Sequence, residues 1–248
     1  MMSNKNSSIQ KQSPFWVLFK TEVKLALRGG DMILFGIVMP IGIMLLIGFI
    51  SKPQTIRSAF SGVASIGICA AGFMGLPLIF SGLRYEKILK RYKATPVSPI
   101  LLIAADFLLE TIFALTTGII IVLIAVLVFK AQVADYGRFT LTFLFSIFSI
   151  FSLGVLISAL VPNVKMANII CTLIYFPSLF LSGASVPLSI MPKGLQQFAA
   201  VLPMTQTIKL LENSVLGNPV SDDLLRFIIL GIVSIASYAV SIKVFKWE

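Results

Sequence analysis

The sequence predicts an all-α integral membrane protein with six transmembrane helices, and two observations carry this prediction. Hydrophobic residues make up 57% of the 248 residues and charged residues only 12%, with a mean hydropathy of +0.98. An ordinary globular domain is nearer half apolar and a quarter charged. Six apolar stretches also reach about 20 residues, the length that a helix needs to cross a bilayer. The expected spans are residues 32–50, 59–83, 110–129, 139–161, 166–186 and 224–244.

The distribution of Lys and Arg predicts which ends of these spans face the cytoplasm, because basic loops are retained on that side. With the N-terminus inside, thirteen of the twenty Lys and Arg residues fall on the inner side. The other seven are spread thinly over three outer segments. We therefore expect a multi-pass protein of a bacterial plasma membrane with both termini in the cytoplasm. The net charge of +10 reflects this topology, so we expect no nucleic-acid partner.

The chain before the first span, residues 1–30, is a polar tail followed by an amphipathic segment. Lys20, Lys24 and Arg28 recur every four residues and so form one stripe of a helix, while Trp16 and Phe19 line another face. This pattern is typical of a helix that lies in the lipid headgroup plane. Two roles stay open for its basic stripe: anchoring to anionic lipid alone, or binding a cytoplasmic partner as well.

Asp106 and Glu110 lie one turn apart on one face of a predicted helix. The apolar stretch from 99 to 129 is about ten residues too long for a straight crossing. Counting back from residue 129 places the membrane boundary near Glu110, so we expect both carboxylates at headgroup level, paired with nearby Lys or Arg. The alternative is an intramembrane pair that forms a proton or cation site.

The segment after the fifth span predicts a re-entrant helical hairpin in the outer leaflet, over residues 187–220. The span itself is interrupted by Pro177 and by the small Ser182-Gly183 pair. Two short amphipathic pieces then follow, and neither is long enough to cross the membrane. Irregular backbone at such depth is tolerated only where protein or a cavity covers it.

The chain lacks the residues that catalysis or metal binding would need. It contains no histidine, no phosphate-binding loop of the form G-x-x-x-x-G-K-[ST], and no G-x-S-x-G or H-E-x-x-H motif. Its two cysteines, Cys69 and Cys171, both lie in apolar runs. We therefore expect a protein that is not an enzyme and that holds no metal or cofactor of its own.

The loop after the second span, residues 84–99, predicts a short basic helix that ends in a proline turn, since proline disfavours helix in the residue before it. Such a helix can transmit force from a cytoplasmic partner into the next span, whereas a merely solvated loop would leave the turn unexplained. The candidate contact residues are Arg84, Glu86, Ile88, Leu89, Thr95 and Pro96.

Two motifs give the chain its resemblance to the permeases of ABC type 2 exporters. The first is the helix with Arg84 and Glu86 that runs into Thr95-Pro96-x-Ser98. The second is the late order of Phe176-Pro177, Phe180-Leu181-Ser182-Gly183, Pro187-Leu188, Met191-Pro192, Leu202-Pro203 and Leu216-Gly217. The resemblance covers nearly the whole chain, which would then be a single transmembrane domain over residues 1–248. One departure is Lys87, where the family commonly has glycine.

The resemblance implies a core of two six-span permeases, identical or homologous, above two ATPase subunits that bind ATP and magnesium. The loop helix would dock in a groove of the ATPase. The substrate path would run between the permeases along the second and fifth spans. Its candidate residues are Phe73, Phe80, Phe176, Pro177, Phe180, Ser182 and Gly183.

The expected function is therefore that of a permease subunit in an ATP-driven exporter, with energy from a separate subunit. Apolar residues in the candidate path favour a hydrophobic or amphiphilic cargo, such as a drug, antibiotic, peptide or lipid. A role in drug or antibiotic resistance follows from that cargo. The alternatives are a polysaccharide or sodium exporter of the same family and a secondary transporter driven by an ion gradient. A secondary transporter would require buried ionisable groups.

Overall fold

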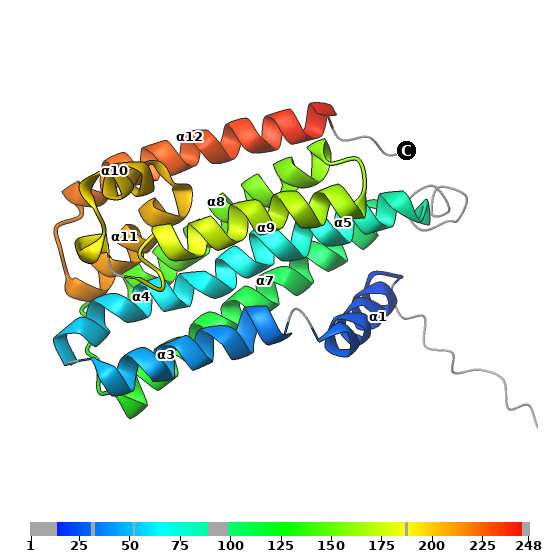
Figure 1. The fold of residues 1–248 in the computed structure, drawn as a ribbon. Coiled ribbons are helices and arrows are strands. Elements are labelled where there is room, and N and C mark those ends of the chain that lie inside the picture. Colours follow the sequence, from blue (N-terminus) through cyan, green and yellow to red (C-terminus); the bar gives the residue numbers. More distant parts are fainter. Residues whose placement is uncertain (1–13, 31–32, 52, 89–98, 187, 245–248) are drawn as a thin grey trace, which may run out of the picture.

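A single long helix, Thr55–Tyr85, runs through the centre of the structure (Figure 1). The structure, a computed structural model, describes residues 14–30, 33–51, 53–88, 99–186 and 188–244. The central helix consists of α4 (Pro53–Ala70), a π-helical turn η2 (Ala71–Gly75) and α5 (Leu76–Tyr85). In its most apolar stretch 78% of the residues are buried, compared with 22–56% in the other four long helices. The second span is therefore the one most enclosed by protein.

The other helices surround this axis. The central helix is contacted by α3, α7, α8, α9 and α11. Outside these helices, α12 packs on α8, and α1 packs on α7. In chain order the remaining elements are α1 (Pro14–Gly29), η1 (Leu34–Val38), α3 (Met39–Ile50), α7 (Pro99–Leu123), η3 (Ile124–Val128), α8 (Tyr136–Leu160), α9 (Val164–Leu181), η4 (Leu188–Ile190), α10 (Lys193–Val201), α11 (Pro203–Leu216) and α12 (Ser221–Val244).

Five helices are long and apolar enough to cross a membrane, and they match the second to sixth predicted spans. The first predicted span corresponds to η1 and α3, which contribute 5 and 12 residues. This helix reaches spanning length only together with α1, and the axes of the two are bent by 76° from each other. The described part of the chain thus has five membrane-spanning helices, or six if the bent pair counts as one.

Two predicted span ends differ from the structure for local reasons. The fifth helix passes through Pro177 without ending but stops at Leu181, five residues before the predicted end. The next turn contains Gly183, whose φ of +92° is incompatible with a right-handed helix. The third helix begins at Pro99, well before the boundary expected near Glu110, because Ile100–Val128 is apolar enough to continue as one helix.

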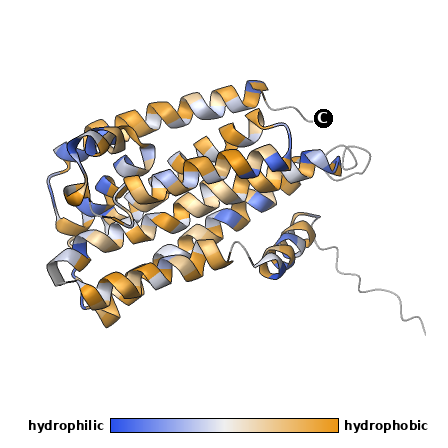
Figure 2. Cartoon of the chain, viewed as in Figure 1, coloured by the Kyte–Doolittle hydropathy of each residue, from blue (hydrophilic) through white to orange (hydrophobic). Residues whose placement is uncertain are grey.

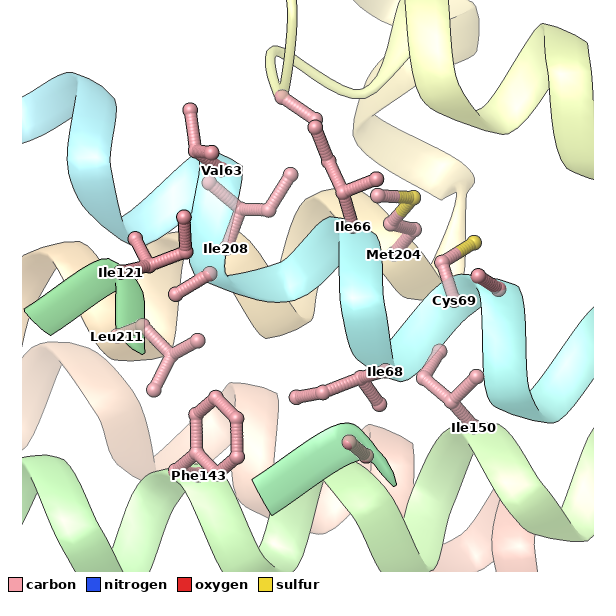
Figure 3. Packing of buried hydrophobic residues seen from close by; sticks show 14 of the residues in the cluster. Val63, Ile66, Ile68, Cys69, Ile121, Phe143, Ile150, Met204, Ile208 and Leu211 are labelled. Atoms are coloured by element: carbon pink, nitrogen blue, oxygen red, sulfur yellow. The ribbon is translucent and has the colours of Figure 1, made fainter. Parts of the chain in front are cut away.

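The apolar core lies where the central helix meets α7, α8 and α11 (Figure 3). From α4, Val63, Ile66 and Ile68 are fully buried. Phe143 of α8 and Leu211 of α11 close the same cluster. Ile208, Leu211 and Val215 thus form a buried face of α11.

Small residues set the helix spacing around the axis. A Cβ at Gly154 of α8 would overlap the backbone carbonyl oxygen of Gly72 in η2, so the two backbones touch. On the α7 side, Thr117 lies against Gly67, and its hydroxyl donates a hydrogen bond to the carbonyl oxygen of Gly36 at 2.6 Å. Close backbone approach of this kind is how helices associate in lipid, where no hydrophobic effect drives them together.

At the end of the bundle that carries α10 and α11, polar side chains join the helices (Figures 1 and 2). Arg138 of α8 forms an ion pair with the buried Asp223 of α12, and Asp223 also accepts a hydrogen bond from the side-chain amide of Asn213 at 2.6 Å. Arg57 donates to the carbonyl oxygen of Val215, near the end of α11. These arginines therefore tie α4, α8, α11 and α12 together at this end of the bundle.

The contact between Gly72 and Gly154 makes a direct prediction about stability. Gly154→Ala should destabilise the chain by about 1–3 kcal/mol, because the clash is with backbone and no side chain can move aside. Gly231→Ala in α12 is the matched control, because no atom lies within 4 Å of the position that its new methyl group would take. That change should be neutral or stabilising by up to about 1 kcal/mol. Thermal unfolding in detergent measures both, and equal midpoints for the two variants would contradict the close contact.

Candidate functional site

The two carboxylates of the third span lack the basic partners that the sequence predicts. Asp106 and Glu110 are both fully buried. Neither oxygen of Glu110 has a hydrogen-bond partner, and the ionisable neighbour of Asp106 on α1 is another carboxyl group, Glu22. Neither Asp106 nor Glu110 forms an ion pair with any basic residue that the structure describes. The expected pairing with nearby Lys or Arg is therefore wrong, because α7 turns these side chains into the protein.

Glu110 borders a cavity of about 390 Å³ between the first, second and third spans. A Cβ at Gly75 would overlap the Glu110 carboxylate, so the glycine lets this carboxylate pack directly against the backbone of η2. The rest of the wall is mostly apolar, with Asn168 of α9 as a further polar group. Asn168 is also exposed, so the cavity reaches the surface beside α9. The lining residues are Phe35, Gly36, Gly67, Ala70, Ala71, Met74, Gly75, Leu78, Ile79, Glu110, Phe113 and Asn168.

Both π-helical turns beside this cavity contribute to its wall. Phe35 and Gly36 come from η1, and Ala71, Met74 and Gly75 come from η2. Such turns are rare, and they occur frequently at functional sites. They widen the helix locally, and here both turns lie at the cavity wall. Most of these residues were missed from the sequence, where glycine in an apolar run gives no sign of which neighbour it faces.

The N-terminal helix lies beside the same part of α7. All three residues of its basic stripe, Lys20, Lys24 and Arg28, are exposed. Phe19 is half-buried in a helix that packs on α7, whereas Trp16 is exposed. Glu22 is close enough to Asp106 to interact with it electrostatically, and burial raises the pKa of the Glu22 carboxyl above its usual value. The helix is therefore attached to the bundle, and its place in the headgroup plane stays a prediction.

The candidate coupling residues are described only in part. Arg84 donates hydrogen bonds to the carbonyl oxygens of Ser158 and, at 2.7 Å, Val161, which ties the end of α5 to the end of α8. Glu86 is exposed just beyond α5, and Lys87 follows with a φ of +56°. That left-handed conformation favours glycine, the residue that the resembled family commonly has there. Ile88 is half-exposed. Leu89, Thr95 and Pro96 lie outside the described residues.

The candidate path residues do not form one surface. Phe73 and Phe80 are buried in the core of this chain, and Ser182 is fully buried at the end of α9. Phe176 is partly buried against the core, whereas Pro177 and Phe180 are exposed on α9. The set thus divides into internal positions, Phe73, Phe80 and Ser182, and surface positions on the fifth span, Pro177 and Phe180. Their role in a path stays a prediction.

A second cavity, of about 570 Å³, lies at the end of the bundle that carries α10 and α11. Ser182, Gly183 and Ser185 line it, together with hydroxyl groups from the start of α4 and the half-buried Glu212 of α11. Burial raises the pKa of the Glu212 carboxyl, while Lys209 and Arg226 act in the opposite direction. The predicted Ser-Gly break in the fifth span therefore borders a polar space.

The α10–α11 pair is the helical part of the predicted hairpin. α11 is largely buried against α4 and α8, whereas α10 exposes Leu195, Phe198 and Val201 and buries only Ala199. Gly217 ends α11 with a φ of +78°, as expected of a helix that stops at glycine. Its re-entrant depth in a membrane stays a prediction.

Comparison with known proteins agrees with this architecture. A sequence model of the family described as "ABC-2 type transporter" matches residues 13–216. The chain is 37% identical over 90 residues to nodulation protein J of Rhizobium leguminosarum bv. viciae, covering 36% of this chain and 35% of that protein. It is 39% identical over 71 residues to the same protein of R. leguminosarum bv. trifolii, and 34% identical over 68 residues to that of Rhizobium meliloti strain 1021. These matches cover 29% and 27% of this chain, and 27% and 26% of the two relatives.

The aligned stretches thus span about a third or less of the curated relatives, whereas the family match extends over most of this chain. Five of the described helices are long and apolar enough to cross a membrane, which suits a multi-pass membrane domain of this kind. The chain belongs to the ABC-2 type transporter family.

Proposed function

We propose that this chain is the permease subunit of an ATP-driven exporter that moves a hydrophobic or amphiphilic compound out of a bacterial cell. Family membership is the observation that carries the proposal. The sequence has no phosphate-binding loop, so the energy would come from a separate ATP-binding subunit, in two copies. That subunit would contact the segment that follows α5, where Glu86 is exposed.

The mostly apolar cavity beside the central helix supports the choice of cargo. Its volume falls within the range of small-molecule sites, which are lined mainly by apolar groups with a few polar ones. A hydrophobic drug, antibiotic, peptide or lipid tail suits such a wall better than a polar sugar chain does. Multidrug or antibiotic resistance would follow if the cargo is toxic to the cell.

A secondary transporter is the second candidate, and the burial of Asp106 and Glu110 favours it. Intramembrane carboxylates often serve proton or cation coupling. The family match weighs against this candidate, and the two differ in their energy source. One experiment therefore separates them.

The fifth span is the proposed contact between two permeases, identical or homologous. Met166, Ile169, Leu173 and Phe180 form an exposed apolar line along α9, with 43–66% of each residue accessible. The prolines and small residues near its end suit close subunit contact and bending. Ser182 itself is buried, so a bulky replacement there would disturb the chain before it could report on a subunit contact.

The energy source is tested by reconstituting the chain in liposomes with and without an ATP-binding subunit of an ABC-2 type transporter. Rhodamine 6G and fluorescently labelled phosphatidylcholine serve as hydrophobic probes. Export should require ATP and should survive a proton uncoupler. Glu86→Ala should reduce ATP-driven export by tenfold or more without loss of membrane insertion. Asp222→Ala, an exposed carboxylate at the opposite end of the bundle, is the control. Export that ignores ATP and stops with the uncoupler would establish the secondary transporter instead.

The subunit contact is tested by cysteine cross-linking in a background that lacks Cys69 and Cys171. Phe180→Cys should cross-link to a second permease in resting membranes, because its side chain is half exposed. Leu179→Cys, one residue away and fully buried, should not. Absence of any product at position 180, with strong cross-linking at Ile232→Cys on α12, would move the interface to the sixth span.

A further inference from the structure

A buried carboxyl group without a partner, that of Glu110, borders the cavity. Both carboxylate oxygens of Glu110 are buried and lack a partner, and the side chain lines the cavity rather than the solid core. A buried carboxylate without a partner is costly as a charge, and an isolated ion in an apolar site is rarely retained. The position is nevertheless built for this side chain, since Gly75 leaves the space that the carboxylate fills. A ligand that brings a positive charge would satisfy it.

The size and wall of the cavity decide what kind of cation fits. A metal ion would need several oxygen, nitrogen or sulfur ligands, and the described residues contain no group of three acidic, cysteine or histidine side chains that could hold one. The cavity of about 390 Å³ is far larger than such an ion requires. Its aromatic and aliphatic walls, from Phe35, Phe113, Met74 and Leu78, suit an apolar body instead. Aromatic rings also attract organic cations through their faces.

We propose that the Glu110 cavity binds an organic cation, an amine or quaternary ammonium group carried on an apolar body. The Glu110 carboxylate would pair with the charge, and the apolar wall would cover the rest. Asn168, exposed at the edge of the cavity beside α9, marks the side from which the ligand enters. That such a cation binds in the cavity is independent of the proposed function. That the same cation is the exported compound rests on the proposed function.

The test is a calorimetric titration of the purified chain in dodecyl maltoside, without any ATP-binding subunit. Phenyltrimethylammonium is the probe, and benzenesulfonate is an anion of similar size and shape. The chain should bind the cation and not the anion. Glu110→Gln keeps the size of the side chain, removes its charge and should weaken binding of the cation at least tenfold. Glu212→Gln, the same change beside the other cavity, should leave the affinity unchanged.

A second variant covers the case in which Glu110→Gln fails to fold. Met74→Trp fills the cavity from a partly exposed position while keeping the carboxylate in the sequence, and it should also abolish binding. Equal affinity of wild type and Glu110→Gln for the cation, equal binding of the anion, or no binding at all would each overturn the inference. ATP-dependent export without cation binding would support the proposed function and overturn the cation site. Cation binding without ATP-dependent export would support the cation site and overturn the proposed function.

Discussion

Enclosing the second span within the bundle is the constraint on which the other helices depend. In lipid the surroundings of a helix are as apolar as its partners, so association relies on close packing and a few polar contacts. The 31 residues of Thr55–Tyr85 meet this requirement through glycines that let α8 and α7 approach their backbone. Gly72 touches Gly154 on one side, and Gly67 accepts Thr117 on the other. The arrangement of α11 and α12 then follows, because both pack on helices that this axis has already positioned.

The cavity is an interruption of the same packing. Around η2 the central helix widens by a π-helical turn, and the facing first span does the same in η1. Between them the wall is left open, and Glu110 of the third span lies there without a partner. A helix whose other sides are held by backbone contacts can thus present one side to a ligand. For a transporter that must open and close, this combines a rigid axis with a local site.

Hydropathy predicted the long spans well, because lipid requires a minimum run of apolar residues. The same measure could not show that Asp106 and Glu110 are buried, since two carboxylates near the end of a long apolar helix look alike whether they face headgroups or protein. It also gave no sign that Phe73 and Phe80 are buried in the core of this chain. Those facts depend on how α7 and the central helix rotate against each other, and single-helix periodicity carries no information about that. Two glycines set helix ends that hydropathy did not locate: Gly183 follows the end of α9 at Leu181, and Gly217 ends α11, both with positive φ.

The central claim is that one side of an otherwise enclosed second span faces an open, ligand-accessible space. Its most direct measurement is the reactivity of single cysteines with a small positively charged thiosulfonate, in membranes that contain no other cysteine. The account predicts rapid labelling of Met74→Cys and Leu78→Cys, which line the cavity. Phe73→Cys and Leu76→Cys, buried on the other sides of the same helix, should stay protected. Equal labelling at all four positions, or labelling of the buried pair alone, would contradict it.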